Sequence, residues 1–177
     1  YMVSEAFLHG FYGKPRIDLE LLRQRHDGLI ALSACLAGAI PQALMNESYA
    51  SAKAYALQMA DIMGEGNFYL ELQNHGIPEQ LAVNQGIGRL ARETGLPLVV
   101  TNDAHYLRKE DAKMQDVLLC IQTGKTVDDQ NRMKFQTQEF YVKSEEELRI
   151  LFPGLDEAFE NTVKIADRCN LEFTFHE

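Results

Sequence analysis

Several residue types are scarce or missing in this chain, and each shortage argues against a class of protein. Tryptophan is absent from the 177 residues, and cysteine occurs only at Cys35, Cys120 and Cys169. Because these cysteines are odd in number, widely spaced and never in a Cys-x-x-Cys pattern, a disulfide framework or a zinc-finger module is not expected. A reducing cytoplasm is the expected compartment.

Long apolar runs are also missing. No stretch approaches the roughly 20 apolar residues that a membrane-spanning helix needs, and nothing at the start of the chain marks a signal peptide. We therefore expect no membrane partner. The chain begins Tyr1-Met2-Val3, without an initiator methionine in first place, so we expect it to be a segment of a longer protein.

Basic residues are outnumbered, with 17 Lys and Arg against 26 Asp and Glu, for a net charge of −9. This balance repels phosphate backbones and argues against the segment alone being a strong nucleic-acid binder, whereas an acidic metal site is compatible with it. The length and the ordinary hydrophobic fraction of 46% predict one globular domain.

What is present is an alternation of two hydrophobic patterns. Short apolar runs at 29–32, 68–72 and 96–100 predict buried strands, and spacings of three and four between them predict helices over 52–63 and 83–91, the latter ending at Gly95. Strands alternating with helices indicate an α/β fold with parallel strands. A doubly wound sheet and a barrel both fit this pattern.

The flanking segments are read in the same way. The start is predicted to be a loop before a helix that Asp18 caps, and 122–132 a polar surface loop. We predict a short strand at 140–142, and two later helices that are divided at Pro153-Gly154. A further amphipathic helix is predicted from the spacing of its apolar residues, which are Met114, Val117, Leu118 and Ile121.

An Asp-x-His pattern follows the third predicted strand. In an extended chain alternate residues point the same way, so Asp103 and His105 can approach one cation together. The ordinary alternative is that the aspartate caps a helix and the histidine bonds within a loop. The pair alone leaves both readings open.

Polar residues also follow the other two predicted strands. Cys35 comes just after the first, and Glu71 and His75 stand at the end of the second, so each strand delivers candidates at its carboxyl end, where parallel α/β folds build their sites. Cys35 alone is typical of a buried structural cysteine. Joined to Asp103 and His105, it would complete a sulfur, oxygen and nitrogen set that favours zinc over magnesium.

The two remaining candidates are weaker. Glu71 lies in an apolar strand and needs a partner, such as a metal, an arginine or a backbone amide, because an unpaired buried carboxylate is costly. His75 is more typical of a loop histidine than of a ligand. Hydrolysis at divalent metals is the chemistry that this set suits, since no Gly-x-Ser-x-Gly or Rossmann pattern is present.

Several motifs, in family order, resemble the polymerase and histidinol phosphatase (PHP) domain of bacterial DNA polymerase III alpha subunits. They are GFY at 10–12, KPR at 14–16, LSACLAG at 32–38, YLELQNHGIP at 69–78 and TNDAHY at 101–106, and the resemblance continues through LCIQTGK at 119–125 to CNL at 169–171.

The resemblance implies a distorted seven-stranded β/α barrel with up to three divalent metals, usually zinc, at the carboxyl ends of its strands. It places Cys35, Asp103 and His105 at late metal-ligand positions, and Glu71 and His75 near the site but outside the usual ligands. Family members that keep all ligands are associated with metal-dependent 3′–5′ exonuclease proofreading, and degenerate ones are structural. The intact Asp-x-His favours the ligand-retaining class.

The sequence departs from the family in one respect. The family pattern opens with a His-x-His and further ligands that should precede Tyr1, so residues 1–177 are expected to be the C-terminal two-thirds of a single PHP domain, without its first strands and ligands. A site with three of about nine ligands should bind metal weakly or not at all. We expect the fragment itself to be inactive, and no catalytic residue is assigned.

Two functions follow from this reading. The first is a fragment of an alpha subunit in DNA replication, with a phosphoesterase or exonuclease-type site that is incomplete here. Nucleotidyl transfer then belongs to the parent polymerase, through which the segment meets DNA, since no palm carboxylates are found. The alternative is an interaction module that braces the remainder of the alpha subunit and docks a proofreading exonuclease subunit. A free-standing phosphatase fits the motifs less well.

Overall fold

A computed structural model describes residues 1–172 and 174–175, and its centre is a small parallel sheet. The strands β3 (Ala31–Leu32), β4 (Phe68–Leu72) and β5 (Leu98–Val100) lie in the order β3-β4-β5. Both neighbouring pairs run parallel. The predicted α/β class and the parallel orientation of the strands are confirmed.

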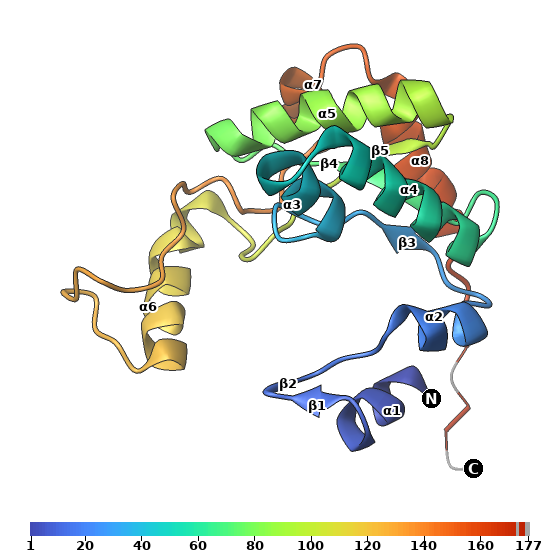
Figure 1. Cartoon of the computed structure of the whole chain (residues 1–177). Helices are drawn as coiled ribbons and strands as arrows, with labels where there is room; N and C mark the ends of the chain where they lie inside the picture. Colours follow the sequence, from blue (N-terminus) through green and yellow to red (C-terminus); the bar gives the residue numbers. More distant parts are fainter. Residues whose placement is uncertain (173, 176–177) are drawn as a thin grey trace.

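Helices connect and cover these strands (Figure 1). The link from β3 to β4 holds α3 (Ala39–Asn46) and α4 (Tyr49–Met63), and α5 (Pro78–Thr94) leads from β4 to β5. Ser48 caps α4, and α5 ends at Gly95, whose φ of +74° is the left-handed conformation that glycine adopts without strain. The helices predicted before and after β4 are confirmed, but α3 was not predicted.

The first 25 residues form a separate layer beside the sheet rather than the predicted loop. They contain α1 (Met2–Leu8) and a hairpin of β1 (Phe11–Tyr12) and β2 (Lys14–Pro15) before α2 (Leu19–Arg25). The helix and the hairpin correct the sequence reading, which relied on Gly10 and Gly13 as loop signals. The cap of α2 is as predicted, because the Asp18 carboxylate accepts a hydrogen bond from the amide of Leu21 at 2.8 Å.

A second excursion leaves the sheet after β5 (Figure 1). The short 3-10 helix η1 (Lys109–Asp111) leads into α6 (Ala112–Thr123), which projects away from the sheet, and an exposed loop returns from it. The predicted strand at 140–142 is reduced to a single bridge between Tyr106 and Tyr141. It does not extend because the amides of residues 105 and 106 both donate to the same carbonyl, that of Phe140.

The chain ends on two helices divided as predicted, α7 (Glu145–Leu151) and α8 (Asp156–Arg168). The helix α8 packs along β5, and its buried Asn161 donates from Nδ2 to the carbonyl of Leu98 at 2.8 Å. Because that carbonyl lies on the side of β5 away from β4, the bond covers an edge that would otherwise be open to another strand.

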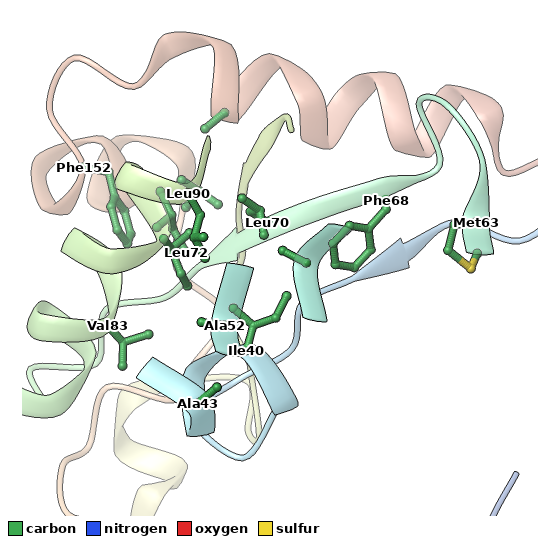
Figure 2. Close-up of a cluster of buried hydrophobic side chains, with 14 of the residues drawn as sticks. Ile40, Ala43, Ala52, Met63, Phe68, Leu70, Leu72, Val83, Leu90 and Phe152 are labelled. Atoms are coloured by element: carbon green, nitrogen blue, oxygen red, sulfur yellow. The ribbon is translucent and has the colours of Figure 1, made fainter. Parts of the chain in front are cut away.

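The core lies between the sheet and its helices, and β4 runs through it (Figure 2). Every residue of β4 is buried, and Leu70, at its centre, has no exposed surface. Leu70 shares the cluster with Ile40 and Ala52 from the first connection and with Leu90 from α5. A central strand covered on both faces explains why the 68–72 run is continuously apolar except for Glu71.

The structure does not confirm a closed barrel, because the parallel sheet of the described residues has three strands and stays open. Cys120, on α6, is buried, whereas Cys169 is exposed. In the ranges that the structure covers, no helix is both long and apolar enough to cross a membrane.

We expect Leu70→Ala to lower the free energy of unfolding by about 2–5 kcal/mol, because it removes a fully buried side chain from the centre of the core. Urea denaturation followed by circular dichroism measures the change. The control is Leu81→Ala on α5, where the side chain is 53% exposed and the loss should stay below about 1 kcal/mol. Equal losses in both variants would show that β4 is not the centre of the core.

Candidate functional site

The carboxyl ends of the three parallel strands meet at one edge of the sheet, and the polar residues singled out in the sequence follow them. Residues 33–35 continue β3, residues 73–75 continue β4, and residues 101–105 continue β5. Because the strands are parallel, these segments are neighbours although they lie far apart in the chain. The predicted gathering of candidates at this edge is confirmed.

Glu71 is the centre of the hydrogen bonding at this edge. Its Oε2 accepts from the amide of Ala34 at 3.0 Å, and its Oε1 accepts from Gln73 Nε2 at 2.8 Å and from the hydroxyl of Thr101. The amide of Glu71 donates to Ser33 Oγ at 2.8 Å. The buried carboxylate thus has the backbone amide that was one of its three predicted kinds of partner, and it joins β3, β4 and β5.

Two residues at the edge hold a left-handed backbone, which side chains other than glycine rarely adopt. Ala34 has a φ of +66° and Asp103 a φ of +41°. Such residues cost about 1 kcal/mol or more and persist where their surroundings hold them. For Ala34 the surroundings include the bond from its amide to Glu71, so the backbone turn and the buried carboxylate support each other.

His75 is buried and both of its ring nitrogens are engaged. Its Nε2 lies 2.7 Å from the carbonyl of Asn102, and its Nδ1 lies 2.8 Å from Gln80 Nε2. A carbonyl can only accept, so Nε2 carries the proton. The Oε1 atom of Gln80 accepts a hydrogen bond from the backbone N–H of His75. The NH₂ group of Gln80 is therefore turned toward Nδ1 of the His75 ring. The ring is therefore neutral and has no lone pair left for a metal.

The surroundings of His75 favour this neutral form. Its ring stacks on that of Phe140, with centroids 4.1 Å apart and planes 9° from parallel. Burial lowers the pKa of His75, and the bond to the Asn102 carbonyl opposes that shift only in part. Since Asn102 directly precedes Asp103, His75 acts on the site by fixing the backbone that presents Asp103.

Asp103 and His105 lie side by side, as the Asp-x-His spacing predicted. The distance from Asp103 Oδ1 to His105 Nε2 is 3.5 Å, and the two side chains are 30% and 40% exposed. The His105 amide donates to the carbonyl of Phe140, and its ring lies 4.8 Å from that of Phe135. An oxygen and a nitrogen donor therefore face one another at a position that solvent reaches.

Cys35 does not join this pair. It is half-buried after β3, and β4 lies between β3 and β5, so the backbones of the outer strands are about 10 Å apart, which is two strand spacings. Among the described residues, no three His, Cys, Asp or Glu side chains gather closely enough to hold a metal ion. The structure thus brings Asp103 and His105 together and leaves Cys35 apart from them after β3, while Glu71 lies between them in β4.

One buried oxygen beside the pair is suited to a cation or a bound water. Asn102 Oδ1 is inaccessible to solvent and has no hydrogen-bond partner among the described residues. A buried acceptor without a donor is unusual and calls for a group that satisfies it. The exposed carboxylate and imidazole of Asp103 and His105 fit a divalent metal, although two protein donors alone do not fill its coordination shell.

Sequence reasoning missed several polar residues that build the edge. Gln73 follows Glu71 at the alternate position that points the same way, so strand periodicity could have found it. Lys143 gave no signal, because lysine is seldom buried, yet its side chain is only 3% exposed. Its Nζ donates to the Glu139 carbonyl and lies 4.1 Å from the centroid of the Tyr141 ring, and burial lowers its pKa.

Comparison with known proteins gives a consistent set of matches. Residues 1–75 match the model of the PHP domain family. The chain is 48% identical over 97% of its length to the DNA polymerase III subunit alpha of Thermus aquaticus, of which it covers 14%. The same protein of Borreliella burgdorferi is 46% identical over 96% of the chain, which covers 15% of it, and that of Treponema pallidum is 47% identical over 95%, with 14% covered.

The two kinds of match cover different parts of the candidate site. The chain spans about 14% of the length of the Thermus relative. The segment that matches the PHP model contains Cys35, Glu71 and His75 and ends before Asp103 and His105, whereas the alpha-subunit matches cover 95% or more of the chain.

We expect Glu71→Gln to lower the free energy of unfolding by about 1–3 kcal/mol, because the new NH₂ group would face the donors that now surround the carboxylate. Chemical denaturation at neutral pH measures the loss. Glu65→Gln, at an exposed turn, provides the control and should change stability by less than about 0.5 kcal/mol. A Glu71 variant as stable as the control would show that the carboxylate does not join the strands.

We also expect nitrogen NMR of the His75 ring at neutral pH to show a proton on Nε2 and none on Nδ1, because Asn102 and Gln80 impose that form. Since burial lowers the pKa of His75 in the folded chain, the unfolded chain takes up a proton first as the pH falls through about 6.5. The His75 contribution to stability is thus fully present above that pH and is lost as the pH falls toward the lower pKa of the folded chain. A doubly protonated ring at neutral pH would contradict this assignment.

Proposed function

Because the chain belongs to the PHP-domain family and is related over almost its whole length to DNA polymerase III alpha subunits, we propose that it contributes to a divalent-metal site for phosphodiester hydrolysis within a replicative polymerase. One observation carries the proposal. The carboxylate of Asp103 and the imidazole of His105 lie 3.5 Å apart at the strand ends, where both remain accessible.

The donor atoms of this pair suit zinc. Oxygen and nitrogen ligands bind Zn²⁺ at about 2.0–2.2 Å, and Asp103 Oδ1 and His105 Nε2 can adopt those distances with small side-chain rotations. Cys35 is proposed as a further ligand, and it would have to approach across the end of β4 from its place after β3. A metal bound here supplies an acidic water and neutralises phosphoryl oxygens.

The other residues of the edge hold the pair in place rather than bind metal. Glu71 fixes the ends of the three strands, and His75 fixes the Asn102 carbonyl that precedes Asp103. The rings of Phe135 and Phe140 pack against His105 and limit the directions in which its imidazole can turn. Glu71 and His75 are therefore proposed to be positioning residues.

The wider context is also proposed. The open three-stranded sheet would be a section of the seven-stranded PHP barrel, and the remaining strands and ligands would come from other parts of the subunit. The partners would be the remainder of the alpha subunit and, through it, DNA in replication. The reaction would be removal of nucleotides from a 3′ end, and the metal would be zinc.

The proposal predicts that Asp103→Asn and His105→Ala each weaken zinc binding by at least about tenfold, because each removes one of two facing donors. Competition with a chromophoric chelator measures the affinity in the complete alpha subunit, where the remaining ligands of the proposed site would be present. His9→Ala is the control, since that histidine is 73% exposed and lies outside the site. Zinc binding that is unchanged in both site variants would overturn the assignment.

The same two variants, placed in the complete subunit, test the reaction. Release of nucleotides from the 3′ end of single-stranded DNA should fall with Asp103→Asn and be lost in a chelator. Polymerisation by the same preparation serves as the control for folding. If neither Asp103→Asn nor His105→Ala lowers the exonuclease rate, the site is not hydrolytic.

The apolar face of α6 supports a second function, that of an interaction module. The residues that predicted an amphipathic helix face outward instead of into the core, with Met114 65%, Leu118 57% and Ile121 72% exposed. Exposed apolar residues gathered on one side of a helix typically mark a contact with another protein surface. In this function the chain braces the polymerase core through α6 and also docks a proofreading subunit.

For the second function, we expect Leu118→Lys to weaken binding of the chain to the remainder of the alpha subunit supplied as a separate protein. A lysine on this face cannot be buried in a contact without losing its hydration. Analytical ultracentrifugation at micromolar concentrations measures the association. Val163→Lys, at a 60% exposed site on α8, is the control. Equal behaviour of the two variants would assign no partner to α6.

A further inference from the structure

A cavity of about 210 Å³ lies beside the Asp103–His105 pair, between α6 and the loop that returns from it. The aromatic residues Tyr106 and Phe135 form one wall, and Phe135 also packs against His105 at 4.8 Å. Phe135 therefore connects the cavity to the candidate ligand His105.

The cavity is basic although the chain as a whole carries a net charge of −9. Its lining contains three cations, Lys113, Arg132 and Lys134, and one anion, Asp116. Arg132 and Asp116 neutralise each other through two hydrogen bonds of 2.5 and 2.7 Å, and the Arg132 side chain is only 10% exposed. Three cations against one anion leave the lining with an excess of two positive charges.

The two lysines are free to bind a ligand. Among the residues that the structure describes, neither Lys113 nor Lys134 forms an ion pair, and both are exposed at the cavity. Hydrogen bonding to Arg132 is the main cause that lowers the pKa of Asp116, and the charge of Lys134 lowers it further, so this one carboxylate faces two of the three cations. The cavity thus keeps an unbalanced positive charge.

The backbone adds to this charge. Ala112 and Lys113, in the first turn of the 12-residue helix α6, line the cavity. The start of a helix carries a partial positive charge, which favours an anion, while the Ala112 amide itself donates to the Lys109 carbonyl in η1. Gln138 adds a polar side chain to the lining. A phosphate-binding pocket is typically built from such groups: two lysines, a helix start, and an arginine whose position is fixed by an ion pair.

We propose that this cavity binds a phosphate group of a single DNA strand, next to the phosphodiester that the Asp103–His105 pair would act on. The choice of DNA as the ligand rests on the proposed function. The positive charge of the cavity does not depend on a bound metal. A strand held here would run past Phe135 toward His105, and an aromatic surface suits a base of such a strand.

The test is binding of a fluorescein-labelled 12-nucleotide oligothymidylate to the 177-residue chain, followed by anisotropy at about 50 mM salt in EDTA. We expect Lys113→Gln and Lys134→Gln each to weaken binding about threefold to tenfold and to reduce the salt dependence by about 0.7 per lost phosphate contact. Lys125→Gln, exposed after α6 and outside the cavity, is the matched control and should change affinity less than about twofold.

The outcomes separate the possible explanations. If all three lysine variants lose affinity equally, attraction is general and the pocket is refuted. If inorganic phosphate alone binds as tightly as the oligonucleotide and Lys134→Gln weakens both, the site takes free phosphate, and the assignment to a DNA strand is wrong. Melting curves confirm that each variant is folded.

The design also distinguishes failure of the pocket from failure of the metal site. Asp103→Asn should keep oligonucleotide binding in EDTA, because it leaves the cavity lining unchanged. If the lysine variants lose DNA while Asp103→Asn keeps its zinc, the pocket stands and the metal assignment falls. If Asp103→Asn loses zinc binding but no lysine variant changes the affinity for the oligonucleotide, the phosphate pocket is refuted and the metal site stands.

Discussion

The burial of one carboxylate organises this structure. Glu71 stands in the middle strand of the sheet, 8% exposed, where an ionised group is tolerated only if donors surround it. The donors come from Ala34 after β3, from Gln73 after β4 and from Thr101 after β5. The need to satisfy this charge therefore fixes the ends of all three strands, and with them the starting points of the loops that carry every candidate residue.

The polar residues at this edge divide into two kinds. The polar atoms of Glu71 and His75 form hydrogen bonds within the protein. These residues therefore shape the site but cannot bind a ligand in this arrangement. Asp103 and His105 keep theirs accessible. The same contrast appears at the cavity, where Asp116 holds Arg132 and where Lys113 and Lys134 form no ion pair with any residue that the structure describes. Rigid groups thus hold accessible ones at the surface.

Sequence patterns predicted the parts of the fold that local periodicity determines. Spacing alone predicted three features. They are the buried runs that form β4 and β5, the helix cap at Asp18, and the position of Asp103 and His105 after a strand. What failed depended on distant contacts. The helix α3, whose Ile40 and Ala43 are buried in the core, was missed, and 140–142 needed a partner strand that its neighbours could not supply. The separation of Cys35 from the pair follows from strand order, which spacing does not encode.

The hydrogen bonds around Glu71 also act as a check on how the strands are aligned. Glu71 is paired with Val99, which places Thr101 within reach of the carboxylate. A slip of β5 by one residue would turn Thr101 to the opposite face of the sheet and leave an acceptor buried without its donor. A misaligned sheet would therefore be less stable than the native one. The buried carboxylate thus selects one register of β5 against its neighbours, and with it the position of the loop that carries Asp103.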